Sequence, residues 1–475
     1  MNELLALGAL ALARRIAARD VTPQEVVDAH IARIEAVNPV LNAVVAPRFD
    51  EARAEARRAT DALAGGARSR GPLHGVPCTI KECFEMPGRP WTGGSLLREG
   101  RVGLREATVV RRLREAGAIV LGQTNNPEAL MWFETTNRIY GRTSNAHDPR
   151  RTSGGSSGGE GAIIGAGGSP FGMGSDVGGS IRFPAAFNGC VGHKPSGGLI
   201  PITGHWPDPG GAINRINTVG PLGRRVEDLR ALVGILAGPD GEDPGVYLSF
   251  RADEPIDAMR VRVRFFESNG VARPSAEVAA AVRRAATALA ERGFDARRWR
   301  PPHLKRTGEM WLGTLAASGG ASVAEVIGDG RAVAVGSEFL RWMLGLSPHT
   351  FPALLAALGE GAARTFPGYF EPMRELGLTM YRHLEAELGD HGVLVSPVYP
   401  TTAPRHGSTF LKPHTATYCG VWNALEMPST VVPVGFTPGG LPLAVQVAAL
   451  RGRDALTLWV AERLEETFGG WRPPL

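Results

Sequence analysis

The chain has 475 residues, of which 43% are hydrophobic and 21% charged, proportions that exclude a disordered or fibrous protein. The formal net charge is only +5 and the arginines are scattered, so the composition argues against a nucleic-acid partner. The four cysteines stand at unrelated spacings and the histidines show no metal-ligand pattern. We therefore predict reduced thiols, a cytoplasmic location, and neither a metal ion nor an organic cofactor.

The N-terminal part of the chain has helical patterns. The apolar run from Leu4 to Ala13 is too short to cross a membrane and lacks the flanking residues of a signal peptide. We interpret it as the first turns of an amphipathic helix, and we expect no transmembrane segment. The segment Thr22-Pro23-Gln24-Glu25 has the pattern of a capping box with proline at the first helical position, which predicts the start of a helix. The segment 48–63 is rich in charged residues and predicts a second helix.

The segment from 153 to 198 is unusually rich in glycine and serine. It follows a short strand expected after His74, a helix predicted over 107–116 and a strand predicted over 118–122. Apolar pieces at 162–164 and 181–184 distinguish the segment from a low-complexity linker. Glycines dispersed among residues of buried type indicate tight turns and a close approach of the main chain to another group. This pattern is typical of a site built from backbone.

The second half of the chain continues the alternation of strands and helices. We expect a strand at 260–266, a helix at 276–292, mostly helical structure at about 310–385, and a strand at 393–397. Strands at 430–436 and 441–448 are joined by Thr437-Pro438-Gly439-Gly440, which predicts a hairpin. Because no linker divides the chain, the alternation favours a single α/β domain over residues 1–475.

Lysine is rare in this sequence, and its rarity points to a candidate base. Only four of the 52 basic residues are lysines, at positions 81, 194, 305 and 412. Arginine stays protonated in proteins, whereas a buried lysine can lose its proton near neutral pH. Where arginine takes the place of lysine at most basic positions, each remaining lysine is therefore a candidate for a position that arginine cannot fill.

Several familiar catalytic and binding motifs are absent from the sequence. No stretch matches the dinucleotide fingerprint, the phosphate-binding loop or a His-Glu-x-x-His metal motif. No Gly-x-Ser-x-Gly elbow is paired with a plausible downstream Asp and His, as a Ser–His–Asp hydrolase requires. Serine, lysine and glycine-rich backbone remain. A serine hydroxyl needs a base to become a nucleophile, and a neutral lysine can serve as that base. Attack on an amide also needs backbone N–H donors for the oxyanion, which Gly178-Gly179-Ser180 would supply.

Three segments carry a resemblance to a known family: Gly75-Val76-Pro77 with Lys81, residues 154–160, and residues 174–182. Together they resemble the amidase signature family, and within it the chain is most similar to the fatty-acid amide hydrolases, particularly the second of the two human-type branches. The resemblance covers nearly the whole chain and is dense over a signature core at about 74–200. It implies a central mixed β-sheet surrounded by α-helices.

The resemblance also implies roles for individual residues. Ser180 would attack the amide and become the acyl-enzyme, and Ser156 would relay a proton between Ser180 and Lys81. The main chain of Leu130 would lie near the site, and the peptide bond before Ser156 would be cis. Four backbone N–H groups would form the oxyanion hole, those of Val177, Gly178, Gly179 and Ser180.

The expected activity is hydrolysis of carboxylic amides, such as fatty-acid or aryl amides, to an acid and an amine or ammonia. Two alternatives stay open within the resemblance: a glutaminase-type subunit of a tRNA-dependent amidotransferase, and a hydrolase of short or cyclic amides. A binding protein that keeps the fold without activity is a third. The sequence also leaves open whether the chain forms a homodimer.

Some neighbouring residues have expected supporting roles. Asp176 and Arg182 are expected to pair and brace the nucleophile loop, and Ser157 is expected to act as a hydrogen-bond partner. Glu82 stands where many relatives have aspartate, which can alter the support behind Lys81. The apolar stretch 339–358, within the helical region expected to form the substrate pocket, has two interpretations: a core helix, or the lining of an acyl-binding channel.

Overall fold

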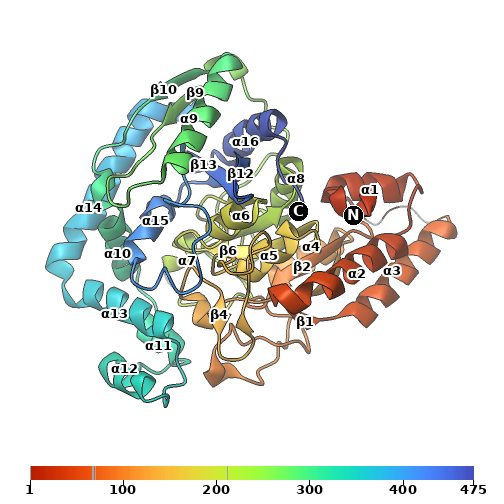
Figure 1. Ribbon diagram of the computed structural model, residues 1–475, viewed down its shortest axis with the longest axis horizontal. Helices are drawn as coiled ribbons and strands as arrows, with labels where there is room; N and C mark the ends of the chain where they lie inside the picture. The colour runs from red at the N-terminus through yellow and green to blue at the C-terminus, as the bar shows by residue number, and fades with distance from the viewer. Residues whose placement is uncertain (1, 67–68, 70, 211, 475) are drawn as a thin grey trace.

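The computed structural model describes residues 2–66, 69, 71–210 and 212–474, and it is built around one large mixed sheet (Figure 1). In the described residues the sheet has 11 strands. Their order across the sheet is β1 (Val44–Pro47), β3 (Ile119–Thr124), β2 (Pro77–Lys81), β6 (Phe171–Asp176), β8 (Thr218–Gly223), β7 (Val191–Lys194), β12 (Ser429–Phe436), β13 (Pro442–Ala449), β11 (Gly392–Pro397), β9 (Arg262–Phe265) and β10 (Asp295–Arg298). Strand β2 runs parallel to β3 and β6, whereas β12 and β13 are antiparallel. The predicted α/β class and mixed sheet are confirmed.

Helices cover both faces of this sheet. Alternate strand residues point to opposite sides, and apolar side chains on both sides need buried neighbours. In β3, Val120 packs into one apolar cluster, whereas Ile119 and Leu121 pack into another. The first cluster includes residues of α1 (Ala9–Ala17), α4 (Thr108–Glu115), α8 (Val226–Leu236), α9 (Ala276–Glu291) and α16 (Asp454–Phe468). The second includes residues of α2 (Pro23–Leu41), α3 (Phe49–Ala64), α5 (Gly158–Gly165) and α6 (Arg182–Asn188). Two buried layers therefore hold the central strands in place.

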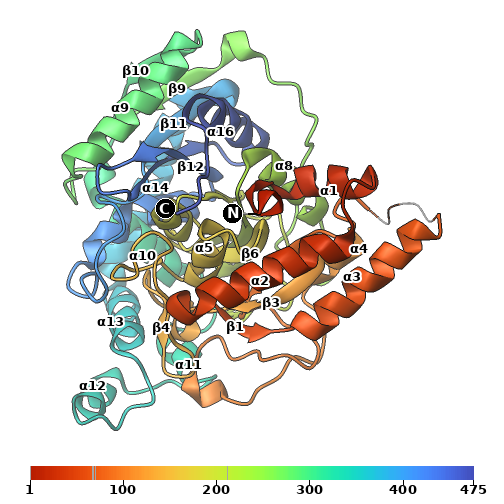
Figure 2. The ribbon, with the colours of Figure 1, turned by 45° about the vertical axis from the view of Figure 1, so that its right-hand side comes forward.

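The C-terminal half carries a separate group of helices on one side of the molecule, whose members α11, α12 and α13 lie at the lower left of Figures 1 and 2. These are α10 (Thr307–Ala317), α11 (Val323–Ile327), α12 (Val335–Met343), α13 (Phe351–Thr365) and α14 (Pro367–Leu388). They confirm the helical region expected at about 310–385. Helix α10 packs against both α14 and α15 (Thr417–Ala424), which connects this group to the strands.

The start of α2 follows the predicted capping box. Thr22 Oγ1 accepts the Glu25 N–H at 3.1 Å, and a Glu25 carboxylate oxygen accepts the Thr22 N–H at 2.8 Å. These two bonds satisfy backbone donors that have no partner within the helix. The hairpin expected near the C-terminus is also present, as β12 and β13.

The expectation of one helix through Leu4–Ala13 is wrong. The chain forms a 3₁₀ turn at Glu3–Ala6, and α1 begins only at Ala9. The cause is a distant residue, Asp228 of α8, whose carboxylate accepts the N–H groups of Ala9 at 2.7 Å and Leu10 at 2.9 Å. A helix start set by so remote a contact leaves no local sequence signal.

Among the described helices, none has the length and apolar character that a membrane span requires.

Candidate active site

Lys81 is the last residue of β2, and its side chain is fully buried. Its Nζ donates to Ser156 Oγ at 2.7 Å and to Ser175 Oγ at 3.0 Å. Burial lowers the pKa of Lys81 to about 8, although nearby acidic groups, those of Cys83, Asp176 and Glu160, act in the opposite direction. The lysine is thus a group that can exchange a proton with a serine hydroxyl near neutral pH.

The two serines of the expected triad lie in adjacent loops. Ser156 follows a cis peptide bond after Gly155 and precedes α5, and Ser180 lies between β6 and α6. The N–H of Ser157 donates to the Ser180 carbonyl at 3.1 Å, which joins the two loops directly. Ser180 is 8% exposed, and its Oγ has no hydrogen-bond partner among the described residues. The structure therefore brings Ser156 to Lys81 and leaves the Ser180 hydroxyl unengaged.

Asp176 organises the loop that carries Ser180. Its carboxylate accepts the backbone N–H groups of Gly179 at 2.6 Å and Ile181 at 3.0 Å, and it pairs with Arg182 at 2.9 Å. Both partners of the ion pair are fully buried. Burial, the largest single influence, would raise the pKa of Asp176, but the charge and hydrogen bond of Arg182, the Lys194 charge and the Ile181 N–H together hold that pKa below its usual range. The expected pairing and bracing role of these two residues is confirmed.

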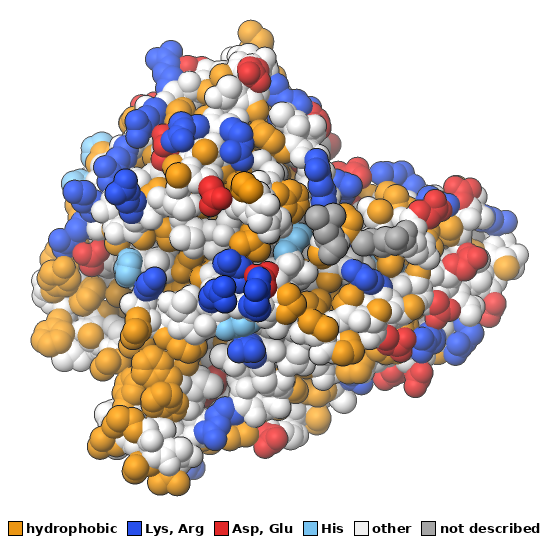
Figure 3. All heavy atoms as spheres, viewed as in Figure 1, with side chains coloured by type: hydrophobic (Ala, Val, Ile, Leu, Met, Phe, Trp, Pro, Cys, Tyr) orange, Lys and Arg blue, Asp and Glu red, His pale blue; other side chains and the backbone are white. Residues whose placement is uncertain are grey.

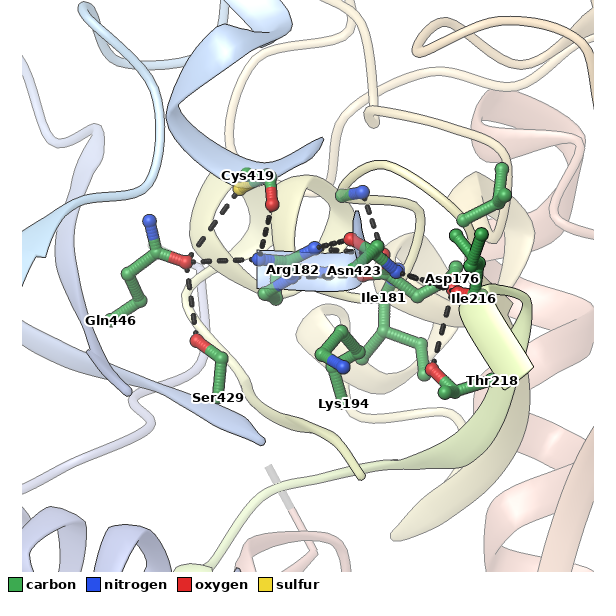
Figure 4. A network of polar contacts seen from close by, with 12 residues as sticks. Asp176, Ile181, Arg182, Lys194, Ile216, Thr218, Cys419, Asn423, Ser429 and Gln446 are labelled. Carbon is green, nitrogen blue, oxygen red and sulfur yellow. Dashed lines mark hydrogen bonds and ion pairs between the residues drawn. The ribbon is translucent and has the colours of Figure 1, made fainter. Parts of the chain in front are cut away.

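The ion pair belongs to a larger polar network that reaches α15 and β13 (Figure 4). Arg182 donates to the Cys419 carbonyl at 3.1 Å and to Gln446 Oε1 at 3.2 Å, and it also contacts Asn423. Asn423 in turn donates to the Asp176 carbonyl at 2.8 Å. The nucleophile loop is consequently tied to segments more than 200 residues away in sequence.

The candidate oxyanion donors differ in their availability. The N–H groups of Val177, Gly178 and Ser180 have no hydrogen-bond partner in the described part of the chain, whereas the N–H of Gly179 is directed to Asp176. Leu130 has a positive φ of 64°, and its N–H donates to the Pro127 carbonyl at 3.0 Å and not to the serines. Three of the four expected donors are therefore free for a ligand.

Glu82 supports the turn that contains Leu130. Its buried carboxylate accepts the N–H groups of Thr92 at 2.6 Å and Gly93 at 2.7 Å. The Gly93 carbonyl then accepts the Ala129 N–H at 2.8 Å. Glu82, which the sequence left without a defined role, thus links the strand of Lys81 to the Leu130 turn.

Two residues close to Lys81 were missed by the sequence reasoning. Ser175 accepts a hydrogen bond from Lys81, and Ser157, as expected, supports it by accepting the Ser175 N–H at 3.3 Å. Glu160 is buried and accepts the hydroxyls of Thr79 at 2.6 Å and Thr124 at 2.9 Å. Burial raises the pKa of Glu160 to about 8. The parallel register of β2 and β6 brings Ser175 to Lys81, and the sequence carries no signal for that register.

The core-helix interpretation of the stretch 339–358 holds for only part of it, and its role in an acyl channel stays a prediction. In α12 no residue is buried: Leu340 is 60% exposed, and Leu344, which follows the helix, is 73% exposed, whereas Leu354 of α13 is buried. Hydrophobic side chains gather on the surface at this end of the molecule (Figure 3). The α12 half is therefore not a core helix.

No group of His, Cys, Asp or Glu side chains within the described ranges is arranged to hold a metal ion.

Comparisons with known proteins agree with this geometry. Residues 25–458 match the amidase family, so the chain belongs to that family and is an enzyme that hydrolyses amides. It is 38% identical to fatty-acid amide hydrolase 2-A of Danio rerio and 36% identical to fatty-acid amide hydrolase 2 of Homo sapiens, over 100% of this chain and 91% of each relative. A solved structure of a fatty acid amide hydrolase has the same fold, with a TM-score of 0.81 at 21% identity over 99% of this chain and 86% of that one. The family resemblance in the sequence is confirmed.

Proposed function

We propose that this amidase acts through an acyl-enzyme on Ser180, with Ser156 as proton relay and Lys81 as base. The observation that carries the proposal is the 2.7 Å contact between Lys81 Nζ and Ser156 Oγ, made by a fully buried lysine whose pKa burial lowers to about 8. The direct backbone link between the Ser156 and Ser180 loops supports the relay.

In the first step, Ser180 Oγ bonds to the amide carbon while its proton passes to Ser156, whose own proton passes to Lys81. The carbonyl electrons move onto the oxygen, and the free N–H groups of Val177, Gly178 and Ser180 stabilise that charge. When the C–N bond breaks, the proton returns from Lys81 through Ser156 to the leaving nitrogen. Water then attacks the ester by the same proton path and releases the acid.

We further propose fatty-acid or aryl amides as the substrate class. The names of the two fatty-acid amide hydrolase relatives support this choice. Trp132, next to the Leu130 turn, and Phe351 both pack against Phe410, with ring centroids 6.3 and 6.1 Å apart. We propose that this aromatic cluster faces the acyl group of the substrate, because such rings favour an apolar group over a polar one.

The test is mass analysis after rapid acid quench with long-chain, aryl and short-chain amides and esters. Wild type should give an acyl mass on the peptide that contains Ser180, and Ser180→Ala should give none. Ser169 is buried, and among the described residues its hydroxyl bonds only the Phe171 carbonyl, so Ser169→Ala is the matched control and should keep the adduct. No adduct, no product and no labelling by a fluorophosphonate would contradict the proposal. Turnover of glutamine alone would favour the glutaminase alternative.

A further inference from the structure

Trp311 of α10 contacts the nucleophile loop across 134 residues of sequence. Its indole Nε1 donates to the Val177 carbonyl at 2.8 Å. The ring is also held between two glycines. A Cβ on Gly178 would lie 2.7 Å from ring atom Cζ2, and a Cβ on Gly420 would lie 2.8 Å from Cγ, both closer than real Cβ contacts. The indole therefore has one well-defined position, between the nucleophile loop and α15.

This contact fixes the direction of a backbone N–H. In a trans peptide the carbonyl and the following N–H point in opposite directions. By binding the Val177 carbonyl, Trp311 holds the Gly178 N–H on the opposite side of the peptide, where it has no partner among the described residues. A peptide that precedes glycine can rotate at low cost, because no Cβ opposes the change. Rotation would replace the N–H with a carbonyl oxygen.

The neighbouring peptide is fixed by a different residue. Asp176 accepts the Gly179 N–H at 2.6 Å, which sets the orientation of the Gly178–Gly179 peptide. Among the described hydrogen bonds, Asp176 makes none to the Val177 carbonyl. It therefore does not fix the orientation of the Val177–Gly178 peptide. Two successive peptides of the loop thus have two independent anchors, one from the loop itself and one from the distant helix α10.

We propose that Trp311 is a positioning residue that keeps the Gly178 N–H available as an oxyanion donor, an inference that rests on the proposed acyl-enzyme mechanism. Trp311 does not exchange protons or form bonds with the substrate in this role. It acts through the Val177–Gly178 peptide, so its loss should weaken binding of the tetrahedral state more than binding of the substrate.

The test compares Trp311→Phe with Trp422→Phe. Trp422 is buried on α15, and its Nε1 has no hydrogen-bond partner among the described residues, so the control removes an indole N–H that makes no bond. We expect Trp311→Phe to lower kcat about 10- to 100-fold with little change in KM, and to weaken a trifluoromethyl ketone inhibitor by a similar factor. The matched alcohol, which forms no tetrahedral adduct, should bind as it does to wild type.

Equal kcat in the two variants would overturn the inference, as would equal weakening of the ketone and the alcohol by Trp311→Phe. If Trp311→Phe folds poorly, benzothienylalanine at position 311 keeps the ring shape and removes only the N–H, and the same comparison applies. The two proposals can fail separately. A wild type without an adduct on Ser180 contradicts the mechanism, whereas an adduct with normal kcat in both position-311 variants contradicts only the role of Trp311.

Discussion

Burial gives Lys81 its chemical character. A lysine in water is charged until well above neutral pH, and a charged lysine cannot accept a proton from a serine. The fully buried position at the end of β2 lowers its pKa to about 8 while two serine hydroxyls surround its Nζ. An arginine in this position would remain charged, so it could not serve as the base that we propose.

The pH dependence of the reaction follows from this shift. A base with a pKa of about 8 is neutral above that value and charged below it, so kcat/KM should rise with pH up to about 8 and then level off. Steady-state rates measured from pH 6 to 10 check this expectation. Lys81→Met should be inactive across the range, and Lys305→Met, which changes an exposed lysine on a 3₁₀ turn, should keep the wild-type profile. A rate that is flat or falls between pH 6.5 and 8 would contradict Lys81 as the base.

A second prediction at this scale concerns Glu82. Glu82→Asp shortens the side chain by one methylene, so the carboxylate should lose its bonds to the N–H groups of Thr92 and Gly93. Because these donors are buried, we expect a loss of about 1–3 kcal/mol in the free energy of unfolding. Urea unfolding measures it, with the exposed Glu99→Asp as control. Equal stability of the two variants would show that the turn does not depend on Glu82.

At the scale of elements, short sequence motifs predicted structure that depends on neighbouring residues. They failed where a residue far away in the sequence determines where a helix starts or where a side chain lies. The capping box of Thr22 and Glu25 predicted the start of α2 because both partners lie within four residues. The start of α1 depends on Asp228, and the position of Ser175 depends on strand register, so neither could be predicted. The site was predictable in part. The family motifs pointed to Lys81 and the two serines as candidate site residues, but they gave no indication of Trp311.

The nucleophile loop is the element whose stability depends most on a buried charge. Asp176→Asn keeps the size of the side chain but leaves the Arg182 charge buried without its partner. We expect a loss of about 3–5 kcal/mol in the free energy of unfolding, together with loss of activity. Asp28→Asn breaks the more exposed pair with Arg53 and should change stability much less. Similar denaturant midpoints for the two variants would contradict this view of the loop.

At the scale of the whole molecule, one sheet connects the two halves of the chain. Strand β7 pairs with β12, placing Thr430 opposite His193, and the His193 ring also contacts Asp454 of α16 at 3.1 Å. The Asp176–Arg182 network extends to Gln446 of β13, which makes a second connection. A sheet joined in this way has no point at which one half can unfold while the other keeps its buried neighbours.

We propose that the chain folds as the single domain expected from its sequence, and we therefore expect one cooperative unfolding transition for the whole chain. Hydrogen exchange with mass analysis can follow peptides from β2 and β6 separately from peptides of β12 and β13 during urea unfolding. All four strands should lose protection at the same urea concentration. Asp176→Asn should lower that concentration equally for both halves, because the ion pair lies in the network that joins them. Loss of protection in β12 and β13 while β2 and β6 stay protected would instead divide the chain into two folding units, with the boundary at the β7–β12 pairing.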